Sequence, residues 1–588
     1  MLIRTSVKIG GSRLSDHDFS SVSLDQGIGG HHIFQIRLSQ NIKKDVLLEK
    51  TKAWIGETVS LGFDYHKDVE LDAIPIKEIF KGIVTSIELS RRRGTSEIVV
   101  KGQSPTILMD DGPMTQSFTD TGLQEIVDKV MKPYSKGFPG KVTITPQNHS
   151  ASIDYTVQYR ENAFSFINRL ANSYGEWFFY DGLDMYFGAK SNGREISLDF
   201  GDNGLHYFDI ALTASPNQLE LKAYDYRRDE AITKKVADHA PSNTLGKEIQ
   251  KKSKNIFSEQ ATRTFQSDLQ QSELNQIAER SAATVTEQIV VLSGSSSNCF
   301  LVPGAVVDIQ DKSLGEKFGK YFVTSVNHSI SQGGDYSNSF QAIPNEVKMP
   351  PHTAKGESPF CETQVGKVSA VDDPDSLGRV QVKLQWQEGS QETTPWIRVT
   401  SPYSGKDKGF YVIPEVGDQV LVSFEDNNPA KPYVLASIYH GKAKPELFNR
   451  DNDIKGFKSR EENKLHFNDK EKSILLSASE KLELFAKKEI SIETGSSGKI
   501  TLDAGNGTVT IIAKTVNVEA ADAVNIKADK DLVLDGGMTV DVKAGMDLKQ
   551  KATNITTKAD GKLENSGANL DLKGTAMVNL QGAMVKIN

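Results

Sequence analysis

The last part of the chain carries an apolar-x-apolar pair about every eight residues, with polar residues between successive pairs. A repeat at such short, near-constant spacing predicts a stack of short strands rather than a globule. The pairs are Ile474/Leu476, Leu482/Leu484, Ile490/Ile492, Ile500/Leu502, Val509/Ile511, Val516/Val518, Val524/Ile526, Leu532/Leu534, Val540/Val542 and Met546/Leu548, and, after a weaker stretch around Ile555 and Leu563, Leu570/Leu572, Val578/Leu580 and Val585/Ile587.

The composition of this repeat region fits such a stack. No Pro, Trp, Tyr, Cys or His follows His466, and beyond Phe467 the sole aromatic residue is Phe485. Proline would remove hydrogen bonds from a continuous strand ladder. Gly, Asn and Asp recur between the pairs, where the chain must turn a corner.

Each repeat is long enough for one strand and one corner, and its apolar positions face one side. A single chain winding alone would need longer turns to enclose a core. Three chains wrapped around a common axis would bury these positions and pair the strand edges. About 15 strands at ~4.8 Å per layer would give a rod on the order of 70 Å long. The expected needle core includes Val524, Ile526, Leu532, Leu534, Val540 and Val542.

Residues 1–350 show short apolar runs between turn residues, which predicts a β-rich domain with a few helices. A helix is expected over residues 123–131, ended by Pro133 and capped by Thr119, Asp120 or Thr121. A second is expected within residues 158–175, where Phe164, Ile167, Leu170, Ala171 and Tyr174 share one face and Gly175 ends it, followed by a β-hairpin.

The pattern is less clear after residue 222. Residues 223–254 are polar and give no assignment, whereas residues 267–290 predict a helix. The serine cluster at 293–297 predicts a turn, and no G-x-S-x-G frame surrounds it to suggest a nucleophile.

A compact β module follows a predicted linker at residues 349–352. Five short strands, at residues 364–368, 379–384, 396–399, 410–413 and 419–424, suggest a small barrel of the OB type. The chain is thus divided into a β-rich region with helices (1–350), a barrel (363–440), a linker (441–470) and the repeat region (471–588).

The composition argues against several classes of function. At 588 residues the chain needs several cores, and its formal charge of -8 argues against nucleic acid as a partner. Cys299 and Cys361 are expected to be separate buried thiols. Residues 1–11 contain no apolar run long enough for a signal peptide or a membrane span. Asp372, Asp373 and Asp375 lack calcium-loop spacing, so no metal is expected there.

Several motifs resemble those of one family, the VgrG-type spike proteins of type VI secretion systems, which are similar to the fused hub and spike of contractile phage tails. The stretch QYRENAFSFINRL at 158–170, with Tyr174-Gly175, resembles the hub signature. In the barrel, DSLGRV at 375–380, WIRV at 396–399 and PEVGDQVLVSF at 414–424 resemble three further motifs, and residues 456–469 resemble the lead-in to the needle.

The resemblance implies a homotrimer without cofactor, metal or catalytic residues. Residues 1–350 would form its hub, with two β modules, and residues 471–588 its needle, with the lead-in at 441–470. Its hub would have an approximately six-fold face that docks on an Hcp-type tube and contacts baseplate proteins. Its needle would be driven transiently through a target membrane. A PAAR-repeat cone, with effectors or their adaptors, would dock at the tip, for which the candidate residues are Gln581, Gly582, Ala583, Met584, Val585, Lys586, Ile587 and Asn588.

The protein would be made in the cytoplasm and exported by injection. Nothing enzyme-like follows the last repeat, and no histidine follows His466, so an unarmed spike without a tip metal is expected. Three other functions stay open: the spike of an extracellular contractile particle or phage-like tail, a cell-wall hydrolase, and a trimeric fibre adhesin. The hydrolase would need a catalytic cleft for which no motif is apparent, and the adhesin would leave the hub and barrel motifs unexplained.

Overall fold

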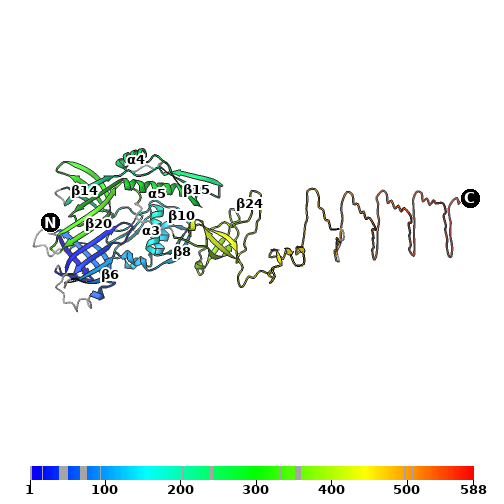
Figure 1. The fold of residues 1–588 in the computed structure, drawn as a ribbon, viewed down its shortest axis with the longest axis horizontal. Coiled ribbons are helices and arrows are strands. Elements are labelled where there is room, and N and C mark those ends of the chain that lie inside the picture. The colour runs from blue at the N-terminus through cyan, green and yellow to red at the C-terminus, as the bar shows by residue number, and fades with distance from the viewer. Residues whose placement is uncertain are drawn as a thin grey trace. The chain divides into compact units, whose positions relative to one another are not determined.

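The computed structural model describes residues 3–15, 17–38, 51–65, 76–92, 95–200, 204–236, 243–331, 333–350, 359–495, 498–505 and 507–587. It divides into two compact units, Met1–Ser479 and Glu480–Asn588 (Figure 1). The first unit contains the sheets and helices, and the second is an extended chain. The protein is therefore mainly β, as the sequence predicted.

A 13-stranded sheet forms the centre of the first unit, in the order β14-β18-β21-β20-β3-β4-β7-β6-β5-β1-β2, with β13 and β19 attached at β20. β3 pairs with β20, so strands far apart in the sequence meet in one sheet. The strands are β1 (Ile3–Ile9), β2 (Ser12–Leu14), β3 (Phe19–Gly27), β4 (Ile33–Leu38), β5 (Thr58–Tyr65), β6 (Glu78–Arg92), β7 (Thr95–Gln103), β13 (Glu195–Asp199), β14 (Leu205–Leu212), β18 (Val290–Ser296), β19 (Val306–Asp311), β20 (Glu316–Ser331) and β21 (Tyr336–Pro344).

Buried apolar residues alternate with exposed polar residues along these strands, so the two faces of the sheet differ. Leu24, Val326 and Phe340 point into the core, whereas their neighbours Asp25, Asn327 and Ser339 are exposed. Such period-two patterning is typical of antiparallel sheets with one face against a core and one toward water. The serine cluster at 293–297, predicted as a turn, falls largely in β18. That prediction was wrong, because pairing with β14 and β21 on either side overrides the local preference of serine.

Two helices cover the core near the hub signature, and both were predicted. The helix α2 (Leu123–Met131) has the predicted bounds, but its cap is Gly122, which makes no side-chain capping bond, so the predicted caps were wrong. The helix α3 (Ala163–Tyr174) begins after Asn162, whose side chain accepts a hydrogen bond from the Ser165 amide. Gly175 ends α3 with φ +70°, a left-handed conformation that favours glycine.

Short strands surround these helices. The strands β8 (Met114–Gly122) and β10 (Ser152–Glu161) pair with each other. The start of the predicted helical stretch, residues 158–161, thus belongs to β10. A three-stranded sheet contains β9 (Val142–Ile144) and the predicted hairpin, formed by β11 (Phe178–Tyr180) and β12 (Met185–Phe187).

The described part of residues 219–289, which includes the stretch without an assignment at 223–254, forms a separate layer. It contains the sheet β16-β15-β17 and two helices, and α5 is the helix predicted at 267–290, four residues shorter at its start and one at its end. Leu274, Ala278 and Ala282 of α5 pack on Leu221 of the sheet. The elements are β15 (Leu219–Asp225), β16 (Glu230–Lys235), α4 (Thr244–Ile256), β17 (Ala261–Asp268) and α5 (Gln271–Ile289).

The barrel region forms a four-stranded sheet in the order β23-β22-β26-β27, with bounds β22 (Gln364–Ala370), β23 (Gln381–Leu384), β26 (Gln419–Phe424) and β27 (Pro432–Ser437). Two predicted strands are absent from it. Residues 396–399 contribute isolated bridges to Val380 and Val434, and residues 410–413 follow the short hairpin of β24 (Ser404–Gly405) and β25 (Lys408–Gly409). The strand β27 escaped prediction.

A small meander ends the first unit. It contains β28 (Ile454–Lys458), β29 (Lys464–Asn468) and β30 (Ser473–Ser477). Ile474 and Leu476, predicted as the first repeat, lie in β30 and pair with β29. The other short elements are the 3-10 helices η1 (Lys52–Trp54), η2 (Pro105–Asp110), η3 (Ser135–Gly137), η5 (Gln385–Gln387) and η6 (Glu425–Asn427).

Three further predictions can be compared with the described residues. Cys299 and Cys361 are both buried, as expected. The predicted linker at 349–352 lies partly outside the described residues. Within the described part of the chain, no helix is long and apolar enough to span a membrane.

Candidate functional site

The second unit exposes its apolar repeats. Every described residue between 480 and 587 is exposed, and none of these residues pairs in a strand within the chain. Figure 1 shows this unit as wide, open coils. The predicted core residues Val524, Ile526, Leu532, Leu534, Val540 and Val542 all retain at least half of their exposure. A stretch this rich in exposed apolar side chains is incomplete as a single chain in water.

The corners of the coil follow the predicted spacing. Bends occur at 521–522, 529–530, 537–538 and 545–546, and then at 553, 560–561, 568, 575–576 and 583. The first apolar residue of each repeat stands two positions after its bend, as Val540 follows residue 538. Met546 therefore lies in a bend and is 98% exposed, so its predicted pairing with Leu548 was wrong.

The bends also explain the weaker stretch of the repeat. Leu548, Ile555 and Leu563 keep the first apolar position, two residues after their bends. The second position is polar there, occupied by Gln550, Thr557 and Asn565. The coil thus continues without interruption where the hydrophobic pattern fades.

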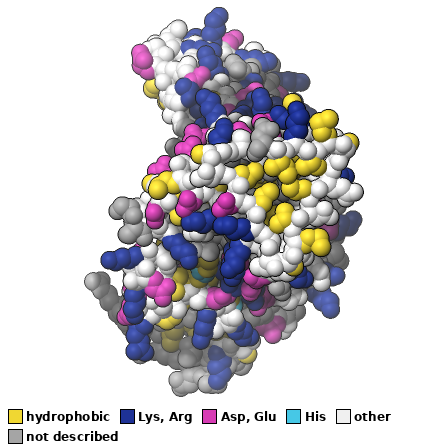
Figure 2. Space-filling model, turned by 90° about the vertical axis from the view of Figure 1, so that its right-hand side faces the viewer, with side chains coloured by type: hydrophobic (Ala, Val, Ile, Leu, Met, Phe, Trp, Pro, Cys, Tyr) yellow, Lys and Arg dark blue, Asp and Glu magenta, His cyan; other side chains and the backbone are white. Residues whose placement is uncertain are grey.

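At the far end of this unit, the candidate tip residues from Gln581 to Ile587 are exposed, with a bend at Ala583. Asn588 lies outside the described residues. Apolar side chains remain uncovered here too, including Met584 and Ile587. Figure 2, which shows one face of the whole chain, also has hydrophobic side chains gathered in one area of the surface.

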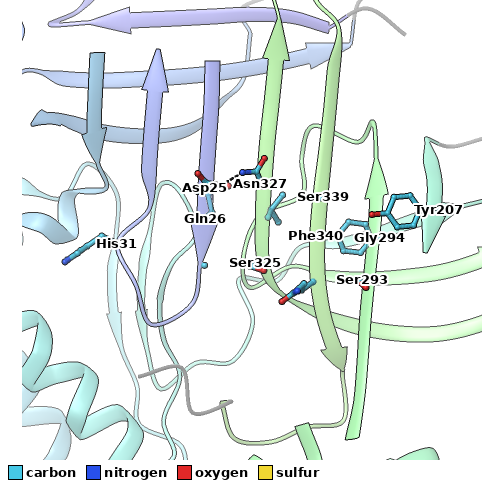
Figure 3. Close-up of a pocket in the computed structure, with 13 residues that line it drawn as sticks. Asp25, Gln26, His31, Tyr207, Ser293, Gly294, Ser325, Asn327, Ser339 and Phe340 are labelled. Atoms are coloured by element: carbon cyan, nitrogen blue, oxygen red, sulfur yellow. Dashed lines mark hydrogen bonds between the residues drawn. The ribbon is translucent and has the colours of Figure 1, made fainter. Parts of the chain in front are cut away.

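A groove of about 510 Å³ lies on the exposed face of the large sheet in the first unit. Its side chains come from β3, β20, β21, β18 and β14, and Figure 3 shows them following one another across these strands. No motif in the sequence indicates this site, although Ser293 and Ser295 alternate along β18. The lining residues are Asp25, Gln26, Gly27, His31, Tyr207, Ser293, Gly294, Ser325, Val326, Asn327, Ser339, Phe340 and Gln341.

A buried histidine pair lies beneath the groove, at the junction of β3 and β20. Gln26 donates to His32 Nδ1 over 3.2 Å and accepts from His328 Nε2 over 3.1 Å. Tyr336 bonds His328 Nδ1 at 2.6 Å. Burial lowers the pKa of both imidazoles to about 3, so both are neutral near pH 7. This network joins the two halves of the sheet.

The barrel motif DSLGRV is explained by a buried ion pair. The Arg379 guanidinium contacts Asp373 Oδ1 at 2.6 Å, and both side chains are almost fully buried. The backbone amides of Asp375 and Leu377 also donate to Asp373, so its carboxylate closes this loop. The guanidinium holds the pKa of Asp373 well below its usual range. Among the described residues, no group of three or more His, Cys, Asp or Glu could hold a metal ion.

The hub signature also has a structural role. Tyr159 Oη donates to Glu362 over 3.1 Å, and the Arg160 guanidinium donates to the same carboxylate over 2.7 Å. Tyr155, Val157 and Tyr159 of β10 share a core with the barrel. Tyr159 and Arg160 of the motif, with Tyr155 and Val157 just before it, join the hub to the barrel.

Two family models match the chain. The phage tail baseplate hub (GPD) model matches residues 32–334, which is more than half of the chain. The type VI secretion system/phage-baseplate injector OB domain matches residues 364–439.

Curated relatives support the same assignment. The type VI secretion system spike protein VgrG1a of Pseudomonas aeruginosa is 23% identical over 368 residues, which cover 56% of this chain and 52% of the relative. VgrG3 of Vibrio cholerae is 25% identical over 322 residues, or 49% of this chain and 31% of the relative. The actin cross-linking toxin VgrG1 of Vibrio cholerae is 24% identical over 328 residues, or 50% and 29%. The match thus spans about half or less of these relatives.

Solved structures share the fold. A chain of the lidded Francisella PdpA-VgrG complex aligns with a TM-score of 0.52 and 11% identity, covering 81% of this chain and 80% of that chain. A chain of the lidless PdpA-VgrG complex aligns with a TM-score of 0.51 and 10% identity, covering 81% and 98%. With the hub match over half its length, the chain belongs to the phage tail baseplate hub family, as a spike protein of the VgrG type.

Proposed function

We propose that three copies of this chain form the spike of a type VI secretion machine, which caps an Hcp-type tube and carries a cone and effectors into a target cell. The exposed apolar repeat of residues 480–587 carries this proposal. The domains act in order: hub (1–350), barrel (363–440), linker and lead-in (441–470) and needle (471–588).

The needle region favours a trimer because every described repeat leaves the same groups without partners. Each coil presents apolar side chains at one position and unpaired backbone groups along the same strand. Other copies wound around the same axis supply both a core and strand partners. Lys543 and Asp541 flank Val542 and bond at 3.0 Å, which places charge on the side opposite the apolar pair. The charged face that carries Asp541 and Lys543 can therefore point outward, toward water.

The hub supports docking on a ring-shaped tube. Its sheet is joined from two halves through β3 and β20, so one chain presents two β modules side by side. Three such chains offer six modules, which suits a hexameric tube. Baseplate proteins would contact the outside of this ring.

The tip supports docking of a separate cone protein. Residues 581–587 leave Met584 and Ile587 uncovered at the end of the coil, and three chains would present a flat apolar end. A PAAR-type cone with effectors or their adaptors would cover it. Removing residues 581–588 should abolish cone capture, and full retention would refute this assignment.

The role proposed is mechanical rather than enzymatic. Buried carboxylates such as Asp373 and Glu176 are held by structural partners, in the case of Glu176 the backbone amides of residues 147–149. The spike would be made in the cytoplasm and exported by injection. An extracellular contractile particle is the second candidate, because the hub family also includes phage tails. Neighbouring genes for membrane-anchoring components would separate the two.

The trimer can be tested with a matched pair of substitutions. Leu534→Asp places a charge at an inward position, and Val533→Asp places it at the adjacent outward position, where the side chain is 78% exposed. An unpaired charge in a core is strongly destabilising. Leu534→Asp should therefore lose detergent-resistant trimers and Val533→Asp should keep them. Val524→Asp and Ile526→Asp should behave like Leu534→Asp. Equal trimer content in all variants, or a monomeric parent by light scattering, would contradict the proposal.

A further inference from the structure

The groove on the exposed sheet face has no role in the spike function proposed above. We propose that it binds a neutral oligosaccharide. The inference rests on the side chains that line the groove, their arrangement in rows and the exposed aromatic ring at one end.

The lining chemistry suits a ligand with many hydroxyl groups. Ser293, Ser325, Ser339, Asn327 and Gln341 each carry a neutral group that can both donate and accept hydrogen bonds. Of the described residues that line the groove, none is Lys or Arg, which disfavours phosphates and anionic polymers. Few apolar side chains line it, which disfavours lipids.

The register places these groups in two parallel rows. Strand pairing aligns one row from β3 to β14 as Asp25, Asn327, Ser339, Ser295 and Tyr207. The second row, two residues along each strand, contains Gly27, Ser325, Gln341, Ser293 and Asp209. Four inter-strand steps of ~4.8 Å make each row roughly 19 Å long. A linear ligand of several sugar units that follows the first row would meet a polar group at every step.

The two ends of the first row differ in a way that would orient such a ligand. At one end, the Tyr207 ring is 51% exposed and offers an apolar face for the C–H side of a pyranose. At the other end, Asp25 lines the groove and accepts a hydrogen bond from the Asn327 side-chain amide (Figure 3). Gly27 has no side chain, and a Cβ there would come no closer than 3.9 Å to its neighbours. The groove is therefore open at this point.

A polypeptide ligand fits this site less well. Extended peptides add to sheet edges through their backbone, whereas β3, β20, β21 and β18 are paired on both sides. Amphipathic helices and proline-rich peptides require apolar or aromatic grooves, and phosphopeptides require arginine clusters. The described lining residues include no arginine, and Tyr207, Phe340 and Val326 are too few to form an apolar or aromatic groove.

Saturation-transfer NMR on the purified full-length chain tests the proposal, with chitotriose and maltotriose as probes. At least one sugar should receive saturation. Tyr207→Ala should weaken binding about tenfold through loss of the ring contact. Gly27→Val should also weaken binding, because it fills the open floor of the groove. Tyr439→Ala, which removes a tyrosine that is 73% exposed on the barrel side of the unit, is the matched control and should bind like the parent.

The two probe sugars distinguish between possible classes of natural ligand. Binding of chitotriose alone supports an N-acetylhexosamine polymer, such as a cell-wall glycan, and binding of maltotriose alone supports a neutral hexose polymer. Binding of neither sugar, equal binding by Tyr207→Ala, or binding of a serine-rich peptide instead would overturn the proposal. Trimer assembly is measured separately, so either proposal can fail alone.

Discussion

Acidification should destabilise the hub through the buried pair His32 and His328. Both side chains are almost fully buried, and burial lowers the pKa of each from 6.5 to about 3. In the unfolded chain each imidazole takes up a proton near its usual pKa, whereas in the folded hub it stays neutral. The unfolded state therefore binds more protons between about pH 6.5 and pH 3. Stability is fully present above this window and is lost as the pH falls through it.

The size of the effect follows from these pKa values. At pH 5 the linkage relation gives about 2 kcal/mol per histidine, or about 4 kcal/mol for the pair. This is a large part of the ~5–15 kcal/mol that stabilises a typical domain. For a hub of about 350 residues, this loss should lower the midpoint of thermal unfolding by roughly 5 °C between pH 7.5 and pH 5.

Circular dichroism melts across this pH range provide the assay, with His32→Gln/His328→Gln as the test variant. Glutamine can retain hydrogen bonds to Gln26 and Tyr336 but does not titrate, so the melting temperature should vary less with pH. His206→Gln, on the exposed surface, is the control and should follow the parent. If the double variant shows the same slope as the parent between pH 7.5 and pH 5, the reasoning fails.

Three further changes test other parts of the structure. Asp373→Asn removes the buried partner of the Arg379 guanidinium and leaves Asp375, whose side chain is 62% exposed, as its counter-charge, which should cost about 2 kcal/mol in urea unfolding of the barrel; an unchanged midpoint would exclude the buried ion pair as a support. Gly188→Ala places a Cβ 2.1 Å from the Thr145 carbonyl oxygen at φ +92°, so soluble yield should fall sharply, and a normal yield would count against this geometry. Asn565→Val replaces a polar side chain at an inward needle position, so the trimer should resist hotter detergent by gel; lower resistance would show that the polar position stabilises the trimer.

Periodic elements could be predicted from the sequence because their residues determine them locally. The helix α3 has an apolar face, a capping Asn162 and a terminal Gly175, and its structure agrees with each. The needle repeat is likewise local, and its bends recur at the expected spacing. Met546 was misplaced because hydrophobicity alone does not distinguish an inward position from a corner.

The groove could not be predicted because tertiary pairing creates it. Its residues come from strands far apart in the sequence, and nothing near Asp25 in the sequence points to Asn327. The segment Ser293-Gly294-Ser295-Ser296 favours a turn on its own, and becomes a central strand only when β14 and β21 pair with it. In the barrel, residues 396–399 resemble a strand, yet they form isolated bridges because only part of the segment lies beside Val380 and Val434.

The pairing of β3 with β20 also determines how late during synthesis the large sheet can be completed. Asp25 and Asn327 are 302 residues apart, so β3 has no partner on that side until most of the hub has been made. At ~5–20 residues per second, this wait lasts about 15–60 s. Throughout it, a strand edge lies open to incorrect pairing with other chains. The yield of folded hub should therefore depend on how soon the segment that contains β20 leaves the ribosome.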